Sequence, residues 1–227
     1  MFEFFSEKHR EGVISLWNKT FKDSREMIEN YLDNMCKNNM VLITEEDRVI
    51  AMASILPVTI RDKKGRYVYA VATDENYRGK GYGKAIMDEI DKIIKERDEH
   101  FAVLVPASES LFDFYEKLGY KQTVFAPPET KIQEDGDQIG PEEYFKIRDE
   151  ILKDLDYVKW SKKDLEYILS FGEIRKINGG AVYIENGKVV ENLTKEIFKE
   201  EWTKPLALIK YINCEEFKKP YFGLAMN

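Results

Sequence analysis

The sequence is poor in the residues that build secreted, membrane-spanning or metal-stabilised proteins. It contains only two cysteines, Cys36 and Cys214, which stand far apart and outside any Cys-x-x-Cys pattern, so neither a disulfide framework nor a metal site is expected. No apolar run approaches the roughly 18 residues of a membrane-spanning helix, and residues 1–5 lack the basic start of a signal peptide. We therefore expect a cytoplasmic protein with no membrane partner.

Basic residues are also outnumbered. The chain has 35 Lys and Arg against 42 Asp and Glu, which gives a net charge of -7. A dedicated nucleic-acid-binding protein needs a clustered basic excess for its phosphate contacts. The composition therefore argues against a nucleic-acid partner and slightly favours cationic ones. A hydrophobic content of 43% over 227 residues is enough to bury at least one full core.

The first part of the chain alternates helical and strand-like patterns. Ser24 can cap a helix, Gly119 can end one in the left-handed conformation, and short β-prone runs are separated by polar turns. The expected elements, in chain order, are helices around Val13–Thr20 and Met27–Met35, strands at Met40–Thr44, Val49–Val58 and Arg66–Thr73, a helix from Ala85 to Arg97, a strand at Phe101–Val105, a helix at Leu111–Leu118 and a strand at Tyr120–Ala126.

A second lobe is expected after the consecutive prolines Pro127 and Pro128. The pattern predicts a domain over residues 1–127, a linker over 128–140 and a smaller α+β lobe over 141–227. In that lobe we expect two helices and a hairpin turning at Asn186-Gly187, since both residues tolerate positive φ. Strands at Leu206–Tyr211 and Tyr221–Ala225 are expected to complete it.

A glycine-rich turn between the strand ending at Thr73 and the following helix has the pattern of a phosphate-binding loop. Its glycines let backbone N–H groups at the start of a helix approach an anion. An ATP-type loop needs Ser or Thr after Lys84, where Ala85 stands, and the dinucleotide fingerprint needs glycine at Lys84 itself. The turn alone leaves two interpretations, a phosphate site or a glycine-rich turn without a ligand. Its residues are Arg78, Gly79, Lys80, Gly81, Tyr82 and Gly83.

Together with its surroundings this turn resembles the GNAT superfamily of N-acetyltransferases. The matching segments are Val68–Thr73, Asp74–Gly83 and Phe114–Tyr120, and the resemblance spans residues 1–127. It implies an α/β fold of the α+β kind with a mixed, largely antiparallel central sheet, and acetyl-CoA as cosubstrate. The later lobe is then expected to be a degenerate GNAT-like half without its own CoA site.

The resemblance also implies which residues hold CoA. The strand ending at Thr73 would splay from Phe101–Val105 and bond the pantetheine arm through its backbone, and Ser108 stands where relatives usually carry Asn. The implied CoA-binding residues are Val71, Ala72, Thr73, Arg78, Gly79, Lys80, Gly81, Tyr82, Gly83, Lys84 and Ser108.

Tyr115 matches the position of the family's general acid, although its helical spacing with Leu111 and Leu118 also suits ordinary packing. Direct attack by an amine needs a base as well, and no carboxylate or histidine identifies itself; a terminal carboxylate at Asn227 is one hypothesis. The first two helices are the expected acceptor wall. The side chains expected to line it are Trp17, Phe21, Tyr31, and Asp23 or Glu26.

The resemblance predicts transfer of an acetyl group to a primary amine of a small molecule or peptide. A rival hypothesis is a noncatalytic acyl-CoA-binding or sensing module, in which Tyr115 only packs. The sequence leaves the acceptor, the acyl-chain preference and a homodimer undecided.

Overall fold

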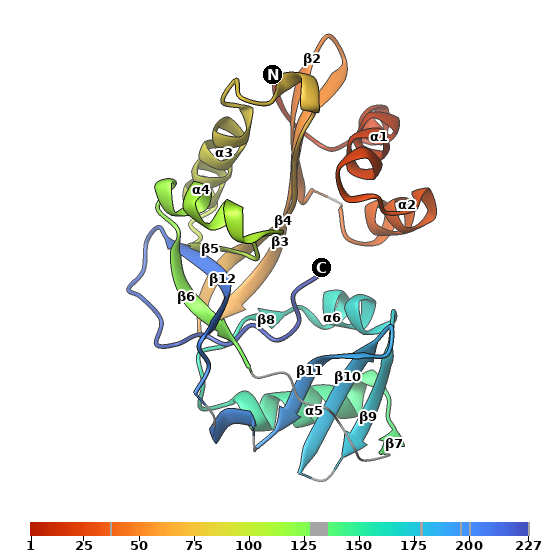
Figure 1. Cartoon of the computed structure of the whole chain (residues 1–227), viewed down its shortest axis with the longest axis vertical. Coiled ribbons are helices and arrows are strands. Elements are labelled where there is room, and N and C mark those ends of the chain that lie inside the picture. The colour runs from red at the N-terminus through yellow and green to blue at the C-terminus, as the bar shows by residue number, and fades with distance from the viewer. Residues whose placement is uncertain (37, 128–135, 178, 196, 200, 227) are drawn as a thin grey trace.

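The computed structural model describes residues 1–36, 38–127, 136–177, 179–195, 197–199 and 201–226. Two sheets and the helices packed on them make an elongated molecule, with the larger sheet in the upper half of Figure 1 and the smaller one below. No helix in these ranges is long and apolar enough to cross a membrane.

The larger sheet, sheet A, is mixed and largely antiparallel, as expected. Strands β4 and β5 pair in parallel, and the other neighbours in the sheet are antiparallel. β8 (Lys159–Trp160) adds to the far end of β3. In spatial order the sheet consists of β1 (Phe2–Phe4), β2 (Met40–Glu45), β3 (Arg48–Ile60), β4 (Lys63–Thr73), β5 (Phe101–Leu104), β12 (Lys204–Tyr211) and β6 (Lys121–Ala126).

Helices cover both faces of sheet A because its strands bury side chains on both sides. Met52 and Leu56 of β3 pack in one core with the first two helices, whereas Ala53 and Ile55 pack in the other core with α3. One face carries α1 (Arg10–Phe21) and α2 (Arg25–Asn34), and the other carries α3 (Tyr82–Glu96) and α4 (Phe112–Lys117). Short 3-10 turns lie at η1 (Glu7–His9), η2 (Glu75–Tyr77), η3 (Glu109–Leu111) and η4 (Ile197–Lys199).

The smaller sheet, sheet B, is antiparallel. Asn186 and Gly187 connect its hairpin with φ values of 51° and 73°, which confirms the expected turn. Pro141 begins a helix and Ser161 caps another, also as expected. The lobe consists of β7 (Asp137–Gln138), α5 (Pro141–Leu152), α6 (Lys162–Leu169), β9 (Glu173–Ile177), β10 (Gly180–Glu185) and β11 (Lys188–Thr194), with sheet order β11-β10-β9-β7.

Strand β12 corrects the expectation that Leu206–Tyr211 completes the second lobe. It lies between β5 and β6 in sheet A, with Leu208 opposite Leu104. Leu208 is fully buried in the core beneath α3, whereas Ala207 and Ile209 are fully buried in the core of the other face. A strand that buries both faces fits the interior of sheet A. Residues 141–227, expected to form one lobe, therefore contribute to both sheets.

The expected linker also differs in part from its prediction. Residues 128–135 lie outside the described residues, but Asp137 and Gln138 pair with Arg175 and Lys176 of β9 as strand β7. Backbone pairing can form a strand without any hydrophobic side chain, so the polar composition of the segment gave no signal for it.

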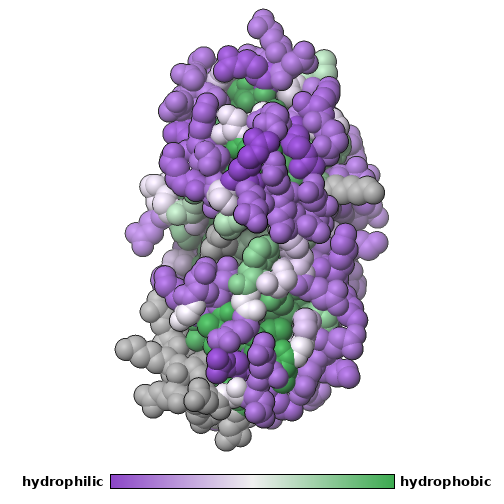
Figure 2. Space-filling view, turned by 90° about the vertical axis from the view of Figure 1, so that its right-hand side faces the viewer, coloured by the Kyte–Doolittle hydropathy of each residue, from purple (hydrophilic) through white to green (hydrophobic). Residues whose placement is uncertain are grey.

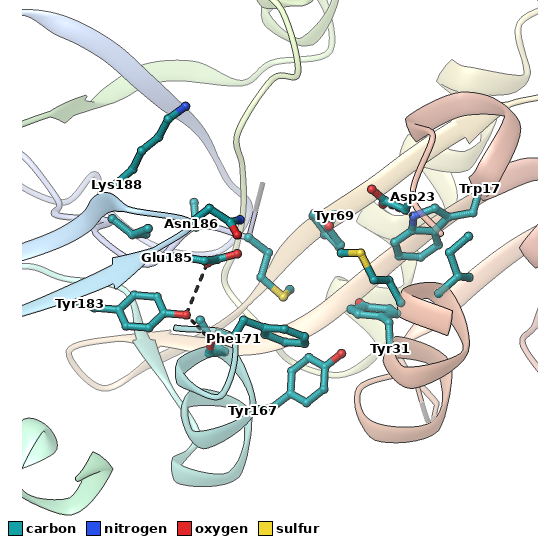
Figure 3. Close-up of a pocket in the computed structure, with 16 residues that line it drawn as sticks. Trp17, Asp23, Tyr31, Tyr69, Tyr167, Phe171, Tyr183, Glu185, Asn186 and Lys188 are labelled. Carbon is teal, nitrogen blue, oxygen red and sulfur yellow. Dashed lines mark hydrogen bonds between the residues drawn. The ribbon is translucent and has the colours of Figure 1, made fainter. Parts of the chain in front are cut away.

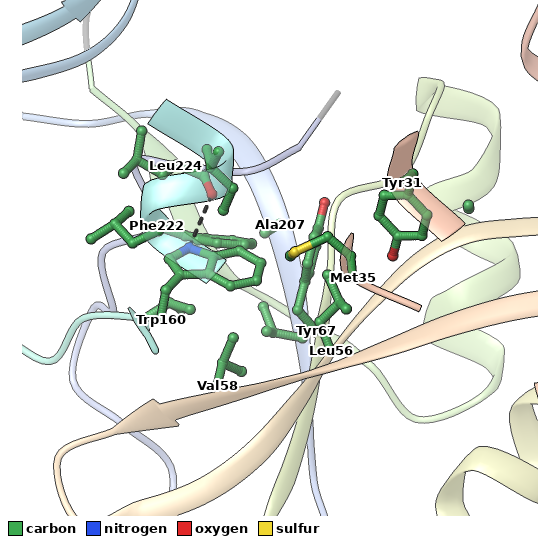
Figure 4. Packing of buried hydrophobic residues seen from close by; sticks show 14 of the residues in the cluster. Tyr31, Met35, Leu56, Val58, Tyr67, Trp160, Ala207, Phe222 and Leu224 are labelled. Carbon is green, nitrogen blue, oxygen red and sulfur yellow. Dashed lines mark hydrogen bonds between the residues drawn. The ribbon is translucent and has the colours of Figure 1, made fainter. Parts of the chain in front are cut away.

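The last described residues run through the interior between sheet A and the lobe. Tyr221 makes a single bridge to Tyr157, so the expected strand at Tyr221–Ala225 does not form. Phe222 is fully buried in the shared core, and the Trp160 indole N–H donates to the Leu224 carbonyl at 3.2 Å (Figure 4). The Tyr67 hydroxyl donates to the Met226 carbonyl at 2.9 Å. These two bonds satisfy carbonyls that have no ladder partner.

Candidate functional site

A cleft runs between β4 and β5 where the two strands separate. They pair only from Gly65 opposite Phe101 to Val68 opposite Leu104, after which β4 continues to Thr73. Pro106 has no N–H to donate, so the chain after β5 cannot extend the ladder. The resulting cleft has a volume of about 430 Å³. Its lining residues are Phe21, Asp23, Val68, Tyr69, Ala70, Val71, Leu104, Val105, Pro106, Ala107, Leu111, Tyr115 and Met226.

A β-bulge lies in β4 at the wall of this cleft. Ala70 and Val71 together oppose Ala53 of β3, and Ala70 adopts a φ of 51°. The left-handed conformation costs a non-glycine residue about 1 to 2 kcal/mol, and a bulge leaves a residue without its ladder partner. The bulge therefore frees backbone polar groups beside the cleft. Alanine carries no signal for positive φ, so sequence reasoning missed this position.

The glycine-rich turn follows β4 and opens α3. Gly79 and Gly81 have φ values of 74° and 86°, and an added Cβ at either would meet no atom within 4 Å. Glycine is thus required by backbone conformation and not by lack of space. The first N–H groups of α3 have no acceptor within the helix. The N-terminus of α3 therefore offers backbone donors and a positive dipole end to an anion.

Side chains of the turn contact other residues of the protein. The Arg78 Nε atom donates to the Thr73 carbonyl at 3.2 Å, and the Lys80 ammonium lies 4.8 Å from the centre of the Tyr77 ring. Tyr82 donates its hydroxyl to Glu45. Lys84 forms an exposed ion pair of 2.5 Å with Asp88.

Tyr115 lines the cleft, whereas Ser108 does not. Ser108 is exposed, and its hydroxyl lies 2.9 Å from that of Ser110. Tyr115 is 6% exposed, and its ring centre lies 5.1 Å from that of Phe114 and 5.8 Å from that of Tyr120. Burial raises the pKa of Tyr115 to about 12, so the phenol stays protonated at neutral pH.

A second cavity, of about 370 Å³, lies between α1, α2, β4 and the lobe (Figure 3). Asp23, Tyr69 and Met226 line both this cavity and the cleft, so the two join at these residues. Its lining residues are Trp17, Asp23, Met27, Ile28, Tyr31, Tyr69, Tyr167, Ile168, Phe171, Tyr183, Glu185, Asn186, Lys188, Val190, Ala225 and Met226.

The turn between α1 and α2 places Asp23 at this junction. Lys22 ends α1 with a φ of 68°, and Ser24 caps α2 by accepting the Met27 N–H at 3.2 Å. Asp23 accepts a hydrogen bond of 2.8 Å from the indole N–H of Trp17, which is almost fully buried. A rigid donor therefore fixes the orientation of the carboxylate.

The structure brings together part of the expected acceptor wall. Trp17, Tyr31 and Asp23 line the second cavity, Phe21 lines the cleft, and Glu26 lines neither. The hypothesis of a base at Asn227 lies outside the described residues, although the preceding Met226 borders both spaces.

The lobe supplies lining residues of the second cavity that sequence reasoning did not name. Tyr167 and Phe171 come from α6 and the residues after it, and Glu185 and Lys188 flank the Asn186-Gly187 turn. The Asn186-Gly187 turn was the one signal in the sequence for this wall, because it predicts that Glu185 and Lys188 lie at the tip of a hairpin. Figure 2 shows this side of the molecule, where apolar surface gathers within largely hydrophilic surroundings; Met27 and Phe171 at the cavity are 54% and 44% exposed.

A family model of the acetyltransferase (GNAT) domain matches residues 3–123. Among solved structures, a GCN5-related N-acetyltransferase from Kribbella flavida aligns with a TM-score of 0.61 at 12% identity, covering 95% of this chain and 65% of that one. A putative acetyltransferase from Pyrococcus horikoshii gives 0.62 at 13% identity, with 96% and 95% covered. A GCN5-related N-acetyltransferase from Anabaena variabilis gives 0.59 at 18% identity, with 83% and 52% covered.

At these identities the structural matches show the fold, and they confirm the expected α+β arrangement. The chain spans about two thirds of the length of the Kribbella protein and about half that of the Anabaena protein. No curated protein matches the sequence.

Proposed function

The chain belongs to the GNAT family of acetyltransferases, and from this premise we propose that it transfers the acetyl group of acetyl-CoA to a primary amine by direct attack. The observation that carries the proposal is the junction of the cleft and the second cavity at Asp23, Tyr69 and Met226. Two substrates that enter from opposite sides would meet there, which removes much of the entropic barrier to reaction.

The cleft and the turn fit the two chemically different parts of CoA. The pyrophosphate would lie at the N-terminus of α3, where each N–H bond to a charged oxygen contributes about 1.5 to 3 kcal/mol. The apolar cleft between Val71 and Val105 would take the pantetheine arm, with backbone groups of Val71, Ala72 and Thr73 as partners. Backbone groups freed by the bulge at Ala70 lie beside the same cleft.

Asp23 is the proposed binding group and proton acceptor for the amine. An alkyl amine with a pKa of about 10.4 is neutral only once in some thousands of molecules at pH 7, a cost of about 4.6 kcal/mol. The Asp23 carboxylate lies at the junction, held by Trp17. It would attract the ammonium, which releases one proton to solvent before attack. The carboxylate would then accept the second proton, which nitrogen loses as the C–N bond forms and the C–S bond breaks.

Tyr115 is the proposed general acid. It lines the cleft that would hold the thioester, and its phenol carries a proton throughout the neutral pH range. The phenol would donate this proton to the departing sulfur. Cys36 and Cys214 line neither space, so neither thiol is placed to form an acyl-enzyme there.

A thiol-release assay over a panel of polyamines, aminoglycosides, amino acids and peptides tests the proposal. The wild type should release CoA with at least one amine, and Asp23→Asn should lower kcat/KM about 100-fold while CoA affinity stays the same. Asparagine keeps an oxygen for the Trp17 N–H, so the fold should be preserved. Glu26→Gln, a carboxylate outside both spaces, is the matched control and should behave as wild type.

Two results would contradict the proposal. CoA binding without turnover of any amine would favour a sensing module. Full activity of Asp23→Asn would remove Asp23 from the reaction.

A further inference from the structure

The second cavity carries a carboxylate on each of two opposite walls. Asp23 comes from the turn after α1 and Glu185 from the end of β10, and they face each other across the cavity in Figure 3. Neither carboxylate forms an ion pair with any residue in the described part of the chain. Both remain available to a cationic ligand.

Glu185 is held only weakly by its neighbours. The Tyr183 hydroxyl lies 3.4 Å from the Glu185 carboxylate but donates at 2.8 Å to the Ile168 carbonyl. Lys188 is the lysine at this cavity, and its ammonium extends away from Glu185 in Figure 3. Glu185 therefore keeps a carboxylate that is not neutralised by an ion pair within the described residues.

Aromatic rings border the space between the two carboxylates. Tyr69, Tyr167 and Phe171 line it (Figure 3), and such rings favour both apolar chains and cations. Burial raises the pKa of Tyr69 above its usual range, and the charges of Asp23 and Glu185 raise it further. Both carboxylates therefore act on the same central ring.

We propose that the acceptor is a diamine, with two ammonium groups joined by a short apolar chain. The reactive amine lies at Asp23, which borders the cleft, and the distal ammonium lies at Glu185, which lines only the second cavity. The aromatic rings contact the chain between them. This inference rests on the proposed acetyl transfer, because it names the molecule that accepts the group.

Binding and turnover of three matched amines test the inference. In calorimetry with CoA present, 1,5-diaminopentane should bind about 10- to 100-fold more tightly than pentylamine, the range expected for one added bond between charged groups. L-lysine is 1,5-diaminopentane with a carboxylate added, and it should bind weakly because that carboxylate would approach Glu185.

Two variants identify the responsible wall. Glu185→Gln should reduce the affinity for 1,5-diaminopentane to that for pentylamine and leave pentylamine binding unchanged. Glu166→Gln makes the same charge change on α6 outside the cavity and should keep the wild-type preference.

The outcomes separate this inference from the proposed function. Equal affinity for pentylamine, an unchanged preference in Glu185→Gln, or tighter binding of L-lysine would overturn the diamine inference, even if an amine is acetylated. Diamine-selective binding that Glu185→Gln abolishes, without CoA release in the turnover assay, would uphold diamine recognition and contradict acetyl transfer.

Discussion

Replacing Tyr115 by phenylalanine removes the proposed general acid and little else. The ring keeps its contacts with Phe114 and Tyr120, and its hydroxyl has no hydrogen bond to another described residue. We therefore expect the free energy of unfolding to change by no more than about 0.5 kcal/mol. Any loss of activity in Tyr115→Phe would then come from the missing hydroxyl and not from a less stable fold.

The expected size of the loss follows from the pKa of the phenol. Burial raises it to about 12, whereas a thiol has a pKa of about 8.5. Proton transfer to a fully formed thiolate would be uphill by about 5 kcal/mol, so the transfer has to accompany cleavage of the C–S bond. General acid catalysis typically raises the rate by about 10² to 10⁴. An acid whose pKa lies this far above that of the leaving thiol should contribute near the lower end of that range. We expect kcat to fall about 100-fold with both KM values unchanged.

Tyr120→Phe is the matched control. Its hydroxyl is buried and has no hydrogen-bond partner among the described residues, so its removal should raise the free energy of unfolding by about 1 kcal/mol and leave kcat intact. The assays are steady-state thiol release and urea unfolding. If Tyr115→Phe retains kcat within about twofold of wild type, Tyr115 serves packing alone and the assignment is refuted.

Two further predictions concern the turn and the buried thiol. Gly81→Glu should weaken CoA binding at least about tenfold in calorimetry, because it adds strain and negative charge at the α3 N-terminus. Gly179→Glu is the control, because Gly179 has a similar φ of 81° and equally open space around it, and it should leave CoA affinity unchanged. An equal loss of CoA affinity in both variants would refute a local phosphate site. Burial raises the pKa of Cys36 from 9.0 to about 12. The unfolded chain therefore ionises first, and stability present below pH 9 is lost as the pH rises toward 12. Between about pH 8 and 10 the wild type should lose about 1.4 kcal/mol more than Cys36→Ala in urea unfolding; parallel losses would contradict this.

The sequence predicted the elements whose signals are local. The caps at Ser24 and Ser161 and the Asn186-Gly187 turn all depend on residues within a few positions of one another. Strand β12 was assigned to the wrong sheet because its partners are chosen by tertiary packing. Its apolar sequence would suit any buried strand. It lies between β5 and β6 because that position offers a hydrophobic core on each face of the strand.

The candidate site also has a part that the local sequence predicts and a part that it does not. The turn at Gly79 and Gly81 could be found because glycine reports a backbone requirement. The second cavity could be anticipated only on the side of the first two helices, where Trp17, Asp23 and Tyr31 lie. Its other lining residues, such as Tyr69 and Glu185, come from distant segments without a shared period. The roles assigned to the CoA-binding residues and the interpretation of the lobe as a degenerate half stay predictions.

The position of β12 also bears on the order in which the protein is made. During synthesis β5 and β6 leave the ribosome long before Lys204–Tyr211 does. Until that strand arrives, two edges that will pair with it have no permanent partner, and unpaired edges invite association with other chains. The lobe lies between β6 and β12 in the sequence, so the whole lobe is synthesised before the strand that fills the gap. Sheet A can therefore be completed only after the lobe that walls the second cavity has left the ribosome.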